Sequence, residues 1–272
     1  MSTQAVAAIR TIHSHLRTVL TSLSPDQWAA PSACAGWRVQ DVLAHVTSNQ
    51  KEFVDPTPPP APSPDQPMPA MTAEQAMEAL VAPRKDWTPA DLLAEYDQYT
   101  ESWFAVLDML QTEPAASAPL ALADLGTYPT HQIAEAFAFD HYCHLRVDLM
   151  APTGPLSIDL PAATHEEVRP GVDWMFAGIP QMQPVELPPV VTAPLGFSLT
   201  GPGAGEWTLR PAADGGLLDV HEGLDADVAA TVSSSAHDFV RWGTKRCDWR
   251  ECTTVSGDES YAATVLDTLN IV

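Results

Sequence analysis

The sequence has few cysteines, few basic residues and no long apolar run. It contains 4 cysteines, and 13 lysines and arginines against 35 aspartates and glutamates, which gives a formal net charge of −22. So few, irregularly spaced cysteines exclude a disulfide framework. We interpret Cys247 and Cys252 as reduced structural thiols, with a redox pair as the less favoured alternative. A chain this acidic repels phosphate backbones and anionic lipid, so we expect it to bind neither nucleic acid nor a membrane surface.

No stretch approaches the roughly 18 apolar residues that a membrane-spanning helix needs. Residues 2–13 also lack the basic leader and apolar core of an export signal. We therefore expect a cytoplasmic protein, either a monomer or a homodimer, that acts on a small molecule. Its 272 residues, 45% of them hydrophobic, suffice for two hydrophobic cores.

Apolar residues recur at helical spacing in four segments of the first 150 residues. These segments are residues 4–23, the helix that carries His45 and ends near Asp55, residues 88–110 and residues 130–150. Thr72 and Thr88 are expected to begin helices, because each is followed three residues later by a capping side chain. Four such helices predict a four-helix bundle.

The proline-rich residues 56–69 cannot be helical, since proline lacks the amide donor. They predict a loop over one end of the bundle, or alternatively a docking segment for another protein.

The pattern changes after residue 150. Residues 151–195 are rich in proline and carry one helical piece around residues 168–179, so they predict a linker. Short strand-like runs follow, at residues 197–200, 207–210 and 228–232, and then two helices at residues 235–243 and 259–269. The predicted fold class is therefore α+β: a helical bundle over residues 1–150, the linker, and a small α+β domain over residues 196–272.

The segment from Phe137 to Asp148 places Asp140 and His144 one helical turn apart. Side chains at positions i and i+4 share a helix face, so both can reach one divalent cation. His45 lies at the edge of an apolar stripe on its own helix and is the candidate third ligand. Two histidines and one carboxylate are a common ligand set that leaves positions open for water or substrate. The alternatives are a surface ion pair on the later helix and a hydrogen-bonded core histidine at residue 45.

The segment from Ser32 to His45 resembles the N-terminal signature of the mycothiol-dependent maleylpyruvate isomerase family, a branch of the DinB-like metalloproteins, and the later helix resembles its second signature. The resemblance implies a metal site in which His45 and His144 match the two histidines of the family. Asp140 stands where the family has a glutamate, one methylene longer, and His141 is the alternative ligand. Asp148 could hold the ring of His144. Residues 225–272 resemble the small sterol-carrier-like domain that closes many family members.

The resemblance also implies a divalent metal, usually zinc, and mycothiol as the thiol cosubstrate. Arg84 stands where family members often carry a basic residue, and it could clamp a substrate carboxylate; the alternative is a solvated loop arginine. Three interpretations remain. The first is an isomerase or S-transferase that adds a thiol to a small electrophile. The second is a non-catalytic metal-binding or regulatory interaction module, and the third is a carrier of a small apolar ligand.

Overall fold

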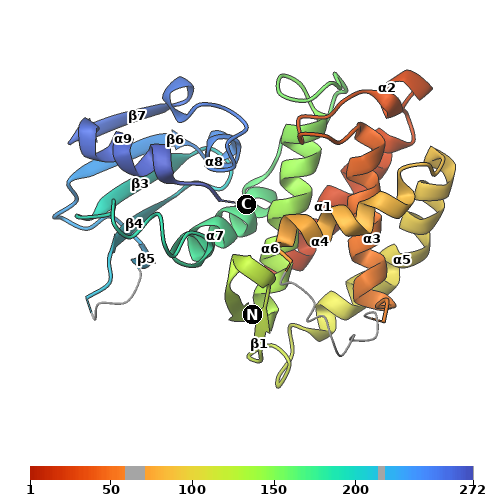
Figure 1. Ribbon diagram of the computed structural model, residues 1–272, viewed down its shortest axis with the longest axis horizontal. Helices are drawn as coiled ribbons and strands as arrows, with labels where there is room; N and C mark the ends of the chain where they lie inside the picture. The colour runs from red at the N-terminus through yellow and green to blue at the C-terminus, as the bar shows by residue number, and fades with distance from the viewer. Residues whose placement is uncertain (59–70, 214–217, 272) are drawn as a thin grey trace, which may run out of the picture. The chain divides into compact units, whose positions relative to one another are not determined.

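The computed structural model describes residues 1–58, 71–213 and 218–271. Most of the proline-rich segment lies outside this part of the chain, so its interpretations as a loop or a docking segment stay predictions. The chain divides into two compact units, each built from separate pieces of sequence. The first unit holds Met1 and residues 16–133 and 144–158, and the second holds residues 2–15, 134–143 and 159–272 (Figure 1).

The described residues combine a helical N-terminal region with a mixed β-sheet in the C-terminal region, which confirms the α+β class. The α-helices are α1 (Thr3–Leu20), α2 (Pro25–Ala29), α3 (Val39–Val54), α4 (Ala73–Val81), α5 (Pro89–Met109), α6 (Ile133–Cys143), α7 (His165–Met182), α8 (Ala236–Gly243) and α9 (Glu259–Thr268). The strands are β1 (Pro119–Ala121), β2 (Thr127–Pro129), β3 (Leu195–Thr200), β4 (Gly205–Pro211), β5 (Leu218–Glu222), β6 (Ala230–Ser235) and β7 (Thr253–Gly257). Short 3₁₀ turns are η1 (Ala82–Arg84), η2 (Ala123–Leu125), η3 (Thr130–Gln132) and η5 (Trp249–Glu251), and η4 (His144–Leu149) is a π-helix.

In the first unit, α3 packs against α5 and α4. The apolar stripe predicted from the sequence is buried, with Val39, Val42 and Val46 fully inaccessible. The side chains of Thr72 and Thr88 each accept a hydrogen bond from the backbone N–H three residues on, so both predicted helix starts are confirmed. A short hairpin of β1 and β2 follows α5.

The segment predicted as one α-helix over residues 130–150 is three different structures. A 3₁₀ turn, η3, leads into α6, and the α-helix gives way to the π-helix η4 at His144. π-Turns are rare, occur mostly as single turns within α-helices, and are frequent at functional sites. The change of helix type therefore falls on the second histidine of the predicted metal motif.

The second unit is built on a five-stranded sheet with the order β5-β4-β3-β6-β7 among the described residues. β3 and β6 are parallel and the other neighbours are antiparallel. Phe176 of α7 stacks on Trp207 of β4 and Phe239 of α8, and also contacts Phe197 of β3, so the aromatic core lies between these helices and the sheet. Helix α9 packs on β6 and β7 (Figure 1).

Helix α7 also packs closely on α6 within this unit. A Cβ added at Gly171 would stand 3.0 Å from the Cα of Phe139, so a residue with a side chain would push the two helices apart. The helix predicted around residues 168–179 is confirmed and is longer at both ends. The predicted domain boundaries at residues 150 and 195 stay a prediction. No helix in the described ranges is long and apolar enough to cross a membrane.

Candidate metal centre

Helix α3 begins at a charged cap and carries His45 in its buried face. Asp41 accepts hydrogen bonds from the backbone N–H and the guanidinium of Arg38, which fixes the first turn. Burial alone would raise the pKa of Asp41, but these hydrogen bonds outweigh it and hold that pKa below its ordinary value. His45 follows one turn later with 3% of its surface exposed.

The loop from Ser32 to Trp37 places an indole beside this histidine. The Ser32 hydroxyl donates to the carbonyl oxygen of Trp37 over 2.8 Å and accepts from the Cys34 N–H over 3.2 Å. Gly36 has φ of +82°, a conformation that favours glycine. The ring centroid of Trp37 consequently lies 5.2 Å from that of His45. The Trp37 Nε1–H donates to Glu78 over 2.9 Å, which fixes the indole.

His45 and His144 come together although 99 positions separate them in the sequence. Their ring centroids are 4.8 Å apart, with the planes inclined at 73°. The Trp37 ring also lies 6.2 Å from the ring of His144, so one indole lies close to both imidazoles. The side-chain nitrogen of Asn49, one turn after His45, lies 3.3 Å from His45 Nε2 and orients that ring.

Asp148 holds the second imidazole. The Nδ1–H of His144 donates to the Asp148 carboxylate over 2.8 Å, and Asp148 is fully buried. The backbone carbonyl of Asp148 in turn accepts from the N–H of Ala33 over 3.0 Å. The signature loop and the π-helix are thereby tied together. A carboxylate on Nδ1 directs Nε2 outward, which is how many metal-ligating histidines are oriented.

Asp140 supplies the carboxylate. It precedes His144 by four residues of continuous helix and is half-buried. Three residues each offer one ligand atom: His45, Asp140 and His144. These three atoms all lie within 4.8 Å of one another. Zinc–ligand distances near 2.1 Å place the ligand atoms of a tetrahedral ion about 3.5 Å apart, so the widest pair would have to close by about 1 Å. The donor types and this small closure fit a divalent cation.

His141, the alternative ligand considered from the sequence, lies beside Asp140, with its Nε2 3.6 Å from that carboxylate, and its other ring nitrogen contacts a second histidine. Its Nδ1 lies 3.1 Å from Nε2 of His13, and both rings are buried. Burial, and then repulsion from His141, hold the pKa of His13 well below its usual range. Within the described part of the chain, the group that could hold a metal contains Asp140 and not His141.

Arg84 is bound to a carboxylate of its own chain. Its Nε and Nη2 donate to the two oxygens of Glu95 over 2.7 and 2.8 Å, and its Nη1 donates to the carbonyl of Leu80. Thr47 donates to the same Glu95 carboxylate over 3.1 Å. Because Arg84 is only 8% exposed, the alternative of a solvated loop arginine is wrong. A substrate clamp at Arg84 stays a prediction, and it would have to compete with Glu95.

Two residues of the site had no role assigned from the sequence. Trp37 belongs to the signature segment, but only the folded loop shows that its ring lies near both histidines. Asn49 could have been found, since it lies four residues after His45 on the same helix face.

The fold and these side chains define a class: α+β proteins whose helical region brings two imidazoles and one carboxylate together as a candidate cation site. The family model for the mycothiol maleylpyruvate isomerase N-terminal domain matches residues 9–145. The chain belongs to this family.

Solved structures agree with this assignment at the level of the fold. A crystal structure of mycothiol-dependent maleylpyruvate isomerase is 19% identical, with 93% of this chain and 91% of that chain covered and a TM-score of 0.57. A histidine-to-alanine mutant of such an isomerase is 18% identical over the same shares, with a TM-score of 0.55. None of the curated proteins compared with the chain matches it.

Proposed function

We propose that the protein is a divalent-cation-dependent enzyme that uses a thiol, and that His45, Asp140 and His144 hold the cation. The observation that carries this proposal is the convergence of their ligand atoms within 4.8 Å. Three protein ligands leave room for water or a thiol at a fourth position, which is the composition of catalytic rather than structural zinc sites. Zinc is the proposed ion.

When bound, the cation would supply a positive charge that favours the thiolate form of a coordinating thiol. The chain's own residues would set the geometry of this site. Asp148 holds His144 in one tautomer, and Asn49 orients the ring of His45. The Trp37 indole lies against both imidazoles and limits the approach of water from that side.

The proposed thiol is mycothiol, which rests on family membership. The proposed reaction is addition of the thiol to a small electrophile such as an unsaturated acid. The thiol then leaves after rotation about the former double bond, as in an isomerase, or stays attached, as in an S-transferase. We also propose a cytoplasmic location, in keeping with four cysteines that are too few and too irregularly spaced for a disulfide framework. A monomer or homodimer stays the expectation.

Metal content per chain tests the site directly. Protein purified without chelator or histidine tag is expected to hold about one divalent ion per chain after zinc loading and desalting. His144→Ala should lose it. His221→Ala is the matched control, because that histidine is exposed on β5 and pairs with Asp225. Metal retained by His144→Ala, or absent from zinc-loaded wild type, would show that the site is assigned wrongly.

A second experiment separates an enzyme from a non-catalytic metal-binding module. Zinc-loaded wild type and His144→Ala are each mixed with mycothiol and a series of cis-unsaturated acids, and isomer or adduct formation is followed by chromatography. Turnover by the wild type alone supports the enzyme. Zinc binding without consumption of any acid or thiol would favour a metal-binding module, and indifference to chelators in a ligand-binding assay would favour a carrier.

A further inference from the structure

Two thiols of the C-terminal unit lie in contact. Cys247 follows α8, and Cys252 comes directly after the 3₁₀ turn η5 and before β7. Their sulfur atoms are 3.5 Å apart, and both side chains are partly exposed. From the sequence, a redox pair was the less favoured interpretation, because four residues separate the two cysteines and no histidine lies nearby at metal-ligand spacing. The fold brings the sulfurs together.

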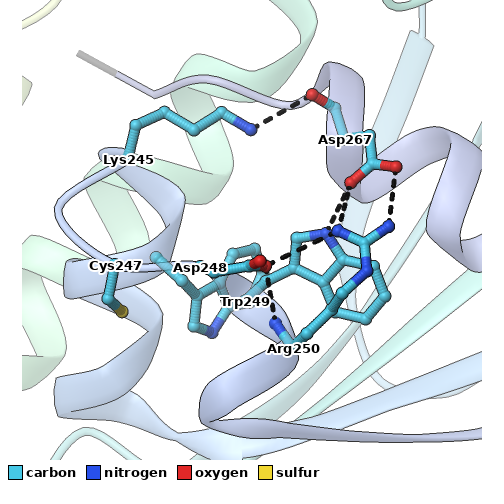
Figure 2. Close-up of a pocket in the computed structure, with 7 residues that line it drawn as sticks. Lys245, Cys247, Asp248, Trp249, Arg250 and Asp267 are labelled. Atoms are coloured by element: carbon cyan, nitrogen blue, oxygen red, sulfur yellow. Dashed lines mark hydrogen bonds and ion pairs between the residues drawn. The ribbon is translucent and has the colours of Figure 1, made fainter.

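Cys247 lines a pocket whose walls, among the described residues, do not include Cys252. The pocket has a volume of about 300 Å³. In Figure 2, Cys247 lies at one edge of the drawn residues, beside Asp248. Its walls come from the end of α8, the segment that follows it and α9. The lining residues are Trp242, Lys245, Cys247, Asp248, Trp249, Arg250 and Asp267. The lining carries two cationic side chains, Lys245 and Arg250, and two carboxylates, so their formal charges balance. A small molecule bound here would meet Cys247.

The surroundings of Cys252 favour its protonated form. Burial, and then contact with Cys247, raise the pKa of Cys252 to about 12. Cys252 therefore keeps its proton at neutral pH. Burial lowers the pKa of the nearby Arg241 guanidinium, but the hydrogen bond to Asp238, and then the neighbouring Cys247, Asp238 and Cys252, outweigh this effect and raise that pKa. Arg241 is held there by Asp238 over 2.7 Å.

We propose that Cys247 and Cys252 form a thiol–disulfide exchange site whose substrate is a small disulfide bound in the adjoining pocket. Cys247 is the attacking sulfur and Cys252 is the resolving sulfur. The assignment rests on the contact between the sulfurs and on the presence of Cys247 alone in the pocket wall. It uses no residue of the metal centre and does not depend on the proposed function.

The reaction balances in two steps. The Cys247 thiolate attacks one sulfur of the small disulfide, which breaks the S–S bond, forms a mixed disulfide and releases one thiolate. Cys252 then gives its proton to the thiolate released first and attacks the Cys247 sulfur, which forms the intramolecular disulfide and releases the second thiolate. That thiolate takes a proton from water, which balances the proton that Cys247 had lost to water. The protein loses two electrons and two protons, and the small disulfide is reduced to two thiols. Closing the bond moves the sulfurs together by about 1.5 Å, to the S–S length near 2.05 Å.

The test uses full-length reduced protein and bis(2-hydroxyethyl) disulfide as the probe, followed by intact mass and peptide mapping. Wild type should lose two hydrogens, with the crosslink between Cys247 and Cys252. Cys252→Ser should stop at a mixed disulfide, one mercaptoethanol on Cys247. In Cys247→Ser, the reaction of Cys252 with the probe should be at least tenfold slower than the reaction of Cys247 in the wild type.

Cys34→Ser is the matched control, because Cys34 is also partly exposed but lies in the first unit. This variant should form the crosslink at the wild-type rate. Serine differs from cysteine by one atom, and circular dichroism verifies that each variant is folded. Wild type that keeps both thiols while Cys34 reacts, or a Cys252→Ser adduct located on a cysteine other than Cys247, would overturn the proposal.

Discussion

His144 donates its Nδ1–H to the carboxylate of Asp148 across 2.8 Å, and both residues belong to the π-helix η4. A carboxylate that is fully buried needs such a partner, since desolvation of an unpaired charge is costly. The same contact fixes the tautomer of the imidazole and sends Nε2 toward the other ligands. Asp148 therefore acts on a cation through His144, as a positioning residue.

Asp148→Asn is expected to weaken zinc affinity by about 10- to 100-fold, because an amide cannot accept and orient the imidazole N–H as a carboxylate does. Competition with a chromogenic chelator measures the affinity. Asp159→Asn, a change of the same type at an exposed residue, should leave it unchanged. Equal affinities in the two variants would show that Asp148 does not position His144 for the metal.

The role of Asp140 can be tested by removing its carboxylate and by lengthening its side chain. Asp140→Ala should lower zinc affinity at least tenfold, since one of three ligands is lost. Asp140→Glu should stay within about tenfold of wild type, because the longer side chain keeps the carboxylate and gains reach toward a site whose ligand atoms spread over 4.8 Å. Isothermal titration with zinc compares the variants. An Asp140→Ala variant with wild-type affinity would remove Asp140 from the ligand set.

Substitution of Arg84 tests whether this residue stabilises the fold or binds the substrate. Its bidentate pair with Glu95 is largely buried, so Arg84→Ala should cost about 3–5 kcal/mol of unfolding free energy, because the Glu95 carboxylate would lose its charged partner and keep the hydrogen bond from Thr47. Urea unfolding measures the loss, and Arg84→Ala/Glu95→Ala should recover part of it. A variant as stable as wild type but with a raised KM would instead support Arg84 as a substrate clamp.

Asp267 makes a pH-dependent contribution to the free energy of unfolding, and the direction of its pKa shift sets the sign of that contribution. Hydrogen bonds from Arg250, and then from Trp249, lower the pKa of Asp267 from 3.8 to about 2. The pKa of Asp267 is lower in the folded than in the unfolded protein. Its stabilising contribution is therefore fully present when the pH is above the unfolded-state pKa of 3.8, and it is lost as the pH falls through about 2. Asp267 is about half exposed, so screening limits the contribution to less than about 1 kcal/mol.

Urea unfolding of wild type and Asp267→Asn should therefore differ most at neutral pH, and the difference should shrink below about pH 4. Glu186→Gln, at an exposed site in a turn, controls for the loss of one negative charge. A difference that grew on acidification would show that Asp267 does not stabilise the folded state as a carboxylate.

The sequence predicted the helices well because local signals and burial agree there. The Thr72 and Thr88 caps and the stripe of Val39, Val42 and Val46 each follow from residues close in sequence. Strands β5 and β7 were missed. They are the two edge strands of the sheet, largely exposed, and β7 reads Thr-Thr-Val-Ser-Gly without a strong apolar alternation.

The candidate site was predictable in its residue types and not in its surroundings. Helical spacing placed Asp140 and His144 together, while His45 came from the apolar stripe and the family resemblance. The π-helix at His144 was not predicted, because its formation depends on tertiary packing rather than on local propensity. The Arg84–Glu95 pair joins residues 11 positions apart across a turn, and no periodic pattern indicates it.

The composition of the second compact unit bears on how the protein can be divided. That unit includes residues 2–15 and 134–143 as well as residues 159–272, and Gly171 of α7 fits against the backbone of Phe139. A fragment that starts at residue 159 would keep the whole sheet but expose the α7 surface that α6 covers. Such a fragment should be prone to aggregation. The C-terminal region should therefore not fold as an independent domain that a single crossover could transfer to another protein.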